Sequence, residues 1–220
     1  IKQDCKYAKC GMRQVKWMEY CDFKYGSEKV SLLGLGCMRL PRLHPEKDDI
    51  DYPKAQEMVD AAILGGVNYF DTAYFYHGGG SETFLGEALA KYPRHQYYLA
   101  DKMPLHLLEK EGDVPRIFAE QLARCKKGYF DFYLCHALSG DNYHKLEDYK
   151  VYSFLQQQKR EGRIRHIGFS FHDEPEVLAK ACRQYEWEFA QIQLNPLDWE
   201  VYRSREQYEV LAQRGIPCIV

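Results

Sequence analysis

The chain has 220 residues and a formal net charge of −2, with 45% hydrophobic and 28% charged residues. This composition is typical of a soluble globular protein, and the length suits one domain. The near-zero charge excludes a strongly basic nucleic-acid-binding protein, and no run approaches the roughly 18 apolar residues that a membrane span needs. The N-terminal segment is charged and lacks the apolar centre of a signal peptide, so we expect a cytoplasmic protein.

From residue 30 onward, short β-rich runs alternate with amphipathic helical stretches. The expected strands are 30–36, 67–70, 96–102, 130–136, 164–170, 189–195 and 216–220. The expected helices are 53–64, 81–91, 114–126, 144–161, 174–184 and 203–214. Ser81 with Glu82 and Pro175 mark two helix starts, and Gly162 and Gly215 mark two helix ends. This strict alternation predicts a parallel sheet with right-handed crossovers.

Two parallel architectures compete, an open doubly wound sheet and a (β/α)8 TIM barrel. An open nucleotide-binding sheet usually carries a glycine-rich phosphate loop after its first strand. Here GLGCMRLP continues through Leu40 and Pro41 without completing GxGxxG, and no GxxxxGK[ST] motif exists, so the sequence favours the barrel.

Only part of such a barrel is expected. The sequence predicts seven strands and ends inside the seventh, whereas a complete barrel typically needs about 250 residues. We therefore expect a barrel truncated within or just after strand seven, over residues 30–220. Residues 1–29 are expected to form an N-terminal extension that leads into it.

The eight cysteines show neither CxxC nor zinc-finger spacing, so no metal site is predicted from them. Cys135 and Cys218 lie in apolar runs, where a free thiol acts as a small hydrophobic side chain. Free thiols indicate a reducing compartment. Cys5 and Cys10 have no assignment.

Polar side chains stand at the ends of three consecutive predicted strands. Asp71 follows the second strand, Lys102 closes the third and His136 closes the fourth, while Tyr76 lies in the loop after Asp71. Each residue alone has an ordinary structural interpretation, as a helix cap, a solvated amine or a satisfied imidazole. Catalytic groups of a barrel gather at these strand ends, however, so we expect the four residues to form one site.

The four residues form a chemically coherent set for carbonyl reduction. A tyrosine can protonate a carbonyl oxygen if a nearby cation favours its phenolate. Lys102 can supply that cation, Asp71 can orient Lys102, and a neutral His136 can place the substrate oxygen. The partner that such a set lacks is a hydride donor.

With these residues in place, the chain resembles the aldo/keto reductase superfamily from about Val30 onward. The matching stretches are LLGLGCMRLP, GVNYFDTAYFYHGGGSETFLGEAL, LADKMP, FDFYLCHAL, GRIRHIGFSFH and AQIQLNP. The resemblance implies an NAD(P)H-dependent (β/α)8 oxidoreductase that reduces an aldehyde or ketone without a Rossmann domain.

The resemblance also implies a role for each site residue. Tyr76 would be the general acid, Lys102 and Asp71 would lower the pKa of its phenol, and His136 would orient the carbonyl. Ser170 and Gln191 match the residues that bind the nicotinamide carboxamide, and Asp71 also lies beside the nicotinamide ribose.

Several features depart from the commonest family pattern. Phe171 follows Ser170 where many members have Asn, and the loop after Tyr76 reads HGGGSE. Both features resemble a bacterial branch that often carries a C-terminal ferredoxin-like [4Fe–4S] domain, which is expected here only in a longer parent chain. The 220 residues contain no CxxCxxCxxxCP motif.

The cofactor and the partners follow from the same resemblance. NADPH is the expected cofactor and NADH the alternative, with a small-molecule carbonyl compound as substrate; the oligomeric state is not predicted. Tyr74, His77, Met103 and Trp199 either line the substrate pocket or simply pack. A non-catalytic nucleotide-binding or regulatory barrel subunit remains the second hypothesis for the whole chain.

Overall fold

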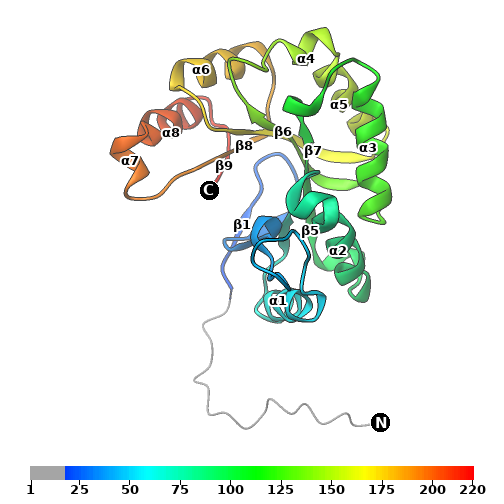
Figure 1. Ribbon diagram of the computed structural model, residues 1–220. Coiled ribbons are helices and arrows are strands. Elements are labelled where there is room, and N and C mark those ends of the chain that lie inside the picture. The colour runs from blue at the N-terminus through cyan, green and yellow to red at the C-terminus, as the bar shows by residue number, and fades with distance from the viewer. Residues whose placement is uncertain (1–17) are drawn as a thin grey trace, which may run out of the picture.

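The computed structural model describes residues 18–220, and a curved seven-stranded parallel sheet forms its centre (Figure 1). The strands of this sheet, in spatial and chain order, are β3 (Gly34–Gly36), β4 (Tyr69–Asp71), β5 (Tyr98–Pro104), β6 (Phe130–Leu138), β7 (Ile164–Phe171), β8 (Phe189–Ile192) and β9 (Cys218–Ile219). Every neighbouring pair is parallel.

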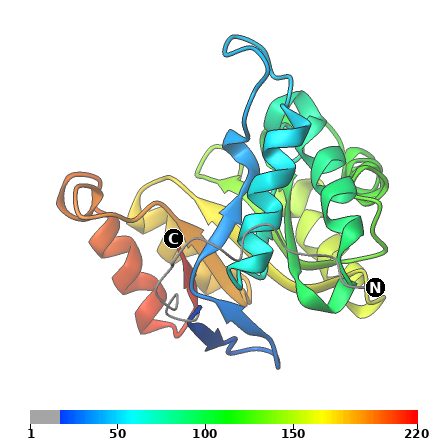
Figure 2. The same ribbon diagram turned by 90° about the horizontal axis from the view of Figure 1, so that it is seen from below.

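Helices connect the strands and lie on the outer side of the sheet (Figure 1). They are α1 (Tyr52–Leu64), α2 (Gly80–Ala88), α3 (Asp113–Arg124), α4 (Lys145–Asp148), α5 (Val151–Arg160), α6 (Pro175–Gln184), α7 (Asp198–Val201) and α8 (Ser204–Gln213). The predicted (β/α)8 class is therefore confirmed, with seven strands where the complete barrel has eight. In Figure 2 the loop over residues 40–51 projects away from the helices.

The first predicted strand, 30–36, is wrong as a single element. Lys29–Ser31 forms β2, which pairs antiparallel with β1 (Tyr20–Asp22), and β3 begins only at Gly34. The Ser31 hydroxyl donates to the Leu33 carbonyl oxygen at 2.7 Å, which turns the chain between the two strands. The apolar run therefore crosses from one sheet to another, which a pattern of hydrophobicity does not reveal.

The hairpin of β1 and β2 closes one end of the barrel interior. Phe23 follows β1 and contacts Phe132 and His166 edge-on, with ring centroids 5.1 Å and 4.5 Å apart. This hairpin straddles the boundary expected between residues 29 and 30, and Phe23, which precedes that boundary, helps to fill the interior. Cys5 and Cys10 lie outside the described residues.

Two helix expectations are also corrected. The predicted helix over 144–161 is two helices, because Lys150 takes a left-handed φ of 53° between α4 and α5. Ser81 is not a helix cap, since its hydroxyl donates to the Cys37 carbonyl oxygen and contacts the Thr72 hydroxyl. The short α7 was not predicted. Gly162 and Gly215 do end helices with positive φ, and Pro175 does begin one, as predicted.

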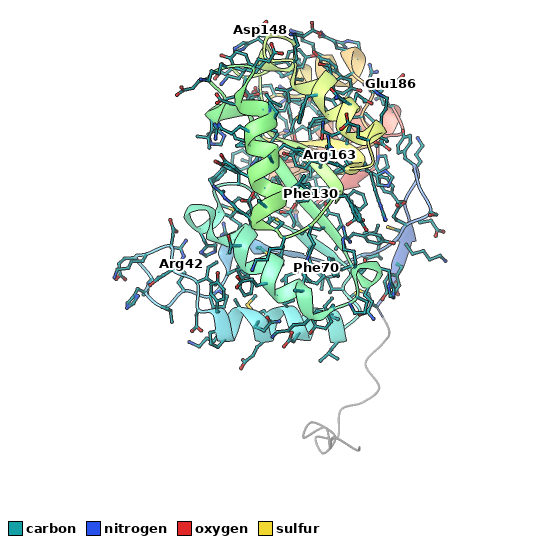
Figure 3. The ribbon with its side chains drawn as sticks, turned by 90° about the vertical axis from the view of Figure 1, so that its right-hand side faces the viewer. Arg42, Phe70, Phe130, Asp148, Arg163 and Glu186 are labelled. Carbon is teal, nitrogen blue, oxygen red and sulfur yellow. The ribbon has the colours of Figure 1, made fainter. Side chains whose placement is uncertain are left out.

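The apolar core has two layers, one on each face of the sheet. A small inner layer fills the barrel and consists of Phe23, Tyr69, Ala100, Phe132, Leu134 and Phe189. The larger outer layer lies between sheet and helices and includes Phe70 and Phe130, both fully buried (Figure 3). Among the described residues, no helix is both long enough and apolar enough to cross a membrane.

The glycine of the SETFLGEAL motif permits a close approach of two helices. A Cβ atom at Gly86 in α2 would lie 2.5 Å from the carbonyl oxygen of Cys125, just past the end of α3. We expect Gly86→Ala to lower the free energy of unfolding by about 1–3 kcal/mol through overpacking. Helix propensity alone would instead raise it by about 1 kcal/mol. Urea denaturation decides between the two signs, with exposed Glu87→Ala on the same helix as the control.

Candidate active site at the carboxyl ends of the strands

Strand alternation directs the predicted site residues to the inside of the barrel. Because side chains alternate between the two faces of a strand, residues two apart share a face. On β6, Phe132 and Leu134 belong to the inner apolar layer, and His136 is the next residue in that series. Likewise Asp71 follows Tyr69, and Lys102 follows Ala100. All three polar groups thus continue an apolar series at the carboxyl ends of neighbouring strands.

Lys102 lies at the centre of the site and is 1% exposed. Its Nζ atom donates to Asp71 Oδ1 at 2.5 Å, to the Thr72 carbonyl oxygen at 2.8 Å and to the Tyr76 hydroxyl at 3.4 Å. Burial by itself lowers the pKa of Lys102, but the charge and hydrogen bond of Asp71, together with the charges of Tyr76 and Asp101, outweigh it, so this pKa lies above its usual value. The amine therefore stays charged inside the protein.

Tyr76 begins a short 3₁₀ turn, Tyr76–Gly79, between β4 and α2. Its ring lies against the Lys102 ammonium, with Nζ 4.9 Å from the ring centroid. Burial raises the pKa of Tyr76 above its usual value; Lys102 opposes this rise and Asp71 adds to it. The expectation that Lys102 and Asp71 together lower the pKa is thus corrected, because only the lysine acts in that direction and burial outweighs it.

His136 is 7% exposed and packs against aromatic rings. Its imidazole stacks on Phe75 at 5.0 Å between centroids and meets the Tyr76 ring edge-on at 5.9 Å. Burial, followed by the Lys102 charge, lowers the pKa of His136 to about 3. The imidazole is therefore neutral at physiological pH, as expected from the sequence for a group that hydrogen-bonds a substrate oxygen.

A buried polar network fixes the backbone of Lys102 from the outer side of the sheet. Gln121 of α3 donates to the Lys102 carbonyl oxygen at 2.9 Å and to Asp101 Oδ1 at 3.0 Å. Asp101 Oδ1 also accepts from the Lys102 amide at 2.8 Å. Glu82, paired with Arg124 at 3.0 Å, completes the network. The outer face of β5 thus anchors the residue whose side chain lies inside.

The structure also brings the predicted cofactor residues together. Ser170 and Gln191 are register partners on β7 and β8, and both continue the inner face of the barrel. Gln191 and Asp71 line a common cavity of about 390 Å³ together with Gly36. The second oxygen of Asp71, Oδ2, is buried and has no hydrogen-bond partner among the described residues. Asp71 and Gln191 therefore face one space.

Some residues near the site were not found from the sequence. The Thr72 carbonyl oxygen holds Lys102, while Phe75 covers one face of His136. His106 meets Phe75 edge-on at 5.1 Å. Backbone oxygens carry no residue-type signal, and Phe75 is one aromatic among many, so spacing alone did not single them out.

The four residues that were candidates for the substrate pocket make hydrogen bonds or packing contacts with their neighbours. The Tyr74 hydroxyl donates to Glu120 at 2.6 Å, and His77 Nε2 accepts from the Leu40 amide at 3.1 Å. Met103 is fully buried on the outer side of β5, and the Trp199 ring lies 6.1 Å from that of Tyr208.

Comparison with known proteins identifies the family. The model of the aldo/keto reductase family matches residues 32–220, so the chain belongs to this family. It is 29% identical over 198 residues to the uncharacterized oxidoreductase YqkF of Bacillus subtilis, covering 84% of this chain and 60% of YqkF. It is 30% identical over 156 residues to the NADH-specific methylglyoxal reductase of Escherichia coli, covering 63% of this chain and 48% of the relative.

The solved structures agree with the family match. The holo form of the aldo-keto reductase AKR11C1 from Bacillus halodurans superimposes with a TM-score of 0.75 and 26% identity, covering 92% of this chain and 65% of that one. The chain thus spans less than two thirds of the length of these three proteins.

Cysteines form no metal centre in the part of the chain that the structure describes. Residues 18–220 contain no group of three or more His, Cys, Asp or Glu side chains placed to hold an ion. Cys37, Cys125, Cys135 and Cys182 are buried free thiols. Burial raises the pKa of the Cys37 thiol to about 12, so this cysteine stays protonated beside the site. The [4Fe–4S] expectation concerned a longer chain and stays a prediction.

The buried His136 makes stability depend on pH. Its pKa is about 3 in the folded protein against 6.5 ordinarily, so the unfolded chain binds more protons between these values. When the pH falls from 7.5 to 5, we therefore expect this side chain to lower the free energy of unfolding by about 2 kcal/mol. Urea denaturation at both values should show a weaker pH dependence for His136→Gln. An equal loss in both proteins would contradict the buried neutral imidazole.

Proposed function

We propose that this protein reduces an aldehyde or ketone by hydride transfer from NAD(P)H, with Tyr76 as the general acid. The observation that carries the proposal is the contact of one buried ammonium, Lys102 Nζ, with Asp71, the Thr72 carbonyl oxygen and the Tyr76 hydroxyl. The membership of an oxidoreductase family supports it. Because the relatives are longer, the activity of the whole protein is part of the proposal.

Tyr76 would donate its phenolic proton to the substrate oxygen as negative charge develops there. The Lys102 cation, 3.4 Å away, stabilises the phenolate that this transfer leaves behind. Asp71 holds the ammonium in place from the other side through the 2.5 Å ion pair. The high pKa of the buried phenol keeps the proton on Tyr76 until it is needed.

His136 would direct the carbonyl toward Tyr76. A neutral imidazole can donate one hydrogen bond to the substrate oxygen without competing as a proton donor. The stack on Phe75 fixes the plane of the ring, and the edge contact with Tyr76 keeps the imidazole beside the phenol. His106 and His172 also have lowered pKa values through burial, so they add no positive charge at neutral pH.

The residues on β7 and β8 fit the nicotinamide end of the cofactor. Ser170 and Gln191 carry the hydroxyl and amide groups that can bind a carboxamide, and the unpartnered Asp71 Oδ2 can accept from a ribose hydroxyl. The bound nicotinamide supplies the hydride. NADPH is the proposed cofactor on the resemblance, and NADH is the alternative that the Escherichia coli relative supports.

Loss of the phenolic hydroxyl tests the assignment. In the full-length natural protein, Tyr76→Phe should reduce carbonyl turnover by about 10²-fold or more, since it removes the proton donor. Cofactor affinity and melting temperature should change little. Stopped-flow measurement of NADPH and NADH oxidation with a panel of aldehydes gives the rate, and fluorescence titration gives the affinity.

The same assay distinguishes the proposed reductase from the alternative, a non-catalytic barrel. Cofactor binding by the natural protein without oxidation by any carbonyl compound would favour the non-catalytic or regulatory barrel. Retention of turnover in Tyr76→Phe would contradict the proposed role of this residue as the general acid.

The upward shift of the Tyr76 pKa predicts how the reduction rate depends on pH. Because burial holds this pKa above its usual value of 10, carbonyl reduction should persist through neutral pH and fall only at more alkaline pH. Lys102→Met removes the cation that opposes the rise, so the alkaline limb of its residual activity should move to higher pH. A kcat/KM profile of both proteins provides the measurement, and an unmoved limb would contradict the pairing.

Cellular location and the iron–sulfur domain remain predictions from the sequence. The division into an extension over 1–29 and a barrel over 30–220 is likewise proposed.

A further inference from the structure

The residue after His136 has an unusual backbone conformation. Ala137 takes φ of 48°, a left-handed value that a non-glycine residue adopts rarely and at an energetic cost. At this point the register of β6 against β7 shifts between Cys135 and Leu138, so one extra residue lies on β6. The bulge sends Leu138 to the outer core and leaves His136 as the last inward side chain of the strand.

Two side chains bind the polar groups that the bulge removes from the strand ladder. The Ala137 amide donates to Ser170 Oγ at 2.8 Å, and the Ala137 carbonyl oxygen accepts from Asn142 Nδ2 at 2.8 Å. Asn142 is itself held, because its Oδ1 accepts from the Ser139 amide at 3.0 Å. One asparagine therefore closes the loop after β6 onto the strained residue.

These contacts have a consequence on each side of Ala137. On the β7 side, Ser170 Oγ already accepts a hydrogen bond, so the hydroxyl hydrogen remains free to donate to a ligand. On the β6 side, the backbone angles of Ala137 determine where β6 ends and thus the direction of the His136 ring. A residue for the substrate and a residue for the cofactor are connected through one strained peptide.

We propose that Asn142 is a positioning residue that holds the Ala137 bulge and thereby aligns His136 with the Ser170 hydroxyl. This inference rests on the proposed function, because it assigns His136 to the substrate and Ser170 to the cofactor. Asn142 touches neither ligand in this scheme. It acts through the Ala137 carbonyl oxygen alone.

The test uses Asn142→Ala in the full-length natural protein. We expect kcat/KM to fall and the NADPH dissociation constant to rise, each by about tenfold, from misplacement of the two side chains. In the protein without cofactor, the Ala137 amide should exchange its hydrogen faster, because its bond to Ser170 is no longer fixed. Fluorescence titration, steady-state kinetics and exchange measured by NMR give the three readouts.

Three further variants separate positioning from general stability. Asn142→Asp keeps the acceptor for Ser139 but loses the donor to Ala137, so it should behave like Asn142→Ala. Asp141→Ala, an exposed neighbour, should behave like the wild type. Ala137→Gly combined with Asn142→Ala should recover most of the affinity and kcat/KM, because glycine adopts a positive φ without strain.

Two outcomes would overturn the inference. One is an unchanged dissociation constant, kcat/KM and Ala137 exchange rate in Asn142→Ala. The other is a loss of activity that follows the loss of melting temperature and that Ala137→Gly does not restore. If the wild-type protein reduces no carbonyl compound, the proposed function fails, whereas the exchange of Ala137 in the cofactor-free protein still decides whether Asn142 holds the bulge.

Discussion

The buried ion pair between Lys102 and Asp71 is the interaction on which the site depends. Both side chains lie inside the barrel, with Nζ and Oδ1 2.5 Å apart. Removing one partner of such a pair typically costs about 3–5 kcal/mol, because the other charge is left buried and unpaired. The pair is therefore tolerated only in an environment that supplies more bonds, and the Thr72 carbonyl oxygen supplies one. The network of Gln121 and Asp101 fixes the backbone behind it.

The low polarity around this pair sets the protonation of the other groups. Burial raises the pKa of Tyr76 and lowers that of His136, so both are uncharged in a site that contains one strong cation. Together these groups can stabilise a carbonyl oxygen that gains negative charge: the phenol is protonated, the imidazole is neutral and the ammonium is fixed. Phe75 contributes by covering one face of the His136 ring.

The grouping of the three strand-end residues was predictable from the sequence because the barrel has a simple geometry. Asp71, Lys102 and His136 each end a strand, and parallel strands end on the same edge of the sheet. Ser170 and Gln191 came only from the resemblance to the family, although they too continue the inner series of their strands. The predictions of one strand over 30–36 and one helix over 144–161 were wrong, because the chain turns at Leu32, Leu33 and Lys150, which have no strong turn preference.

What the sequence by itself determined is the order of elements, the alternation of side chains and the residue types at the strand ends. These are local properties, and local hydrophobic periodicity carries them. Only the tertiary structure decided the balance of charge and burial, since the pKa of Tyr76 depends on neighbours from β4 and β5 and on how much water is excluded. The same holds for the strained Ala137, whose partners Ser170 and Asn142 lie on different segments. Long-range packing brings these residues together, and their spacing along the chain does not predict the contacts between them.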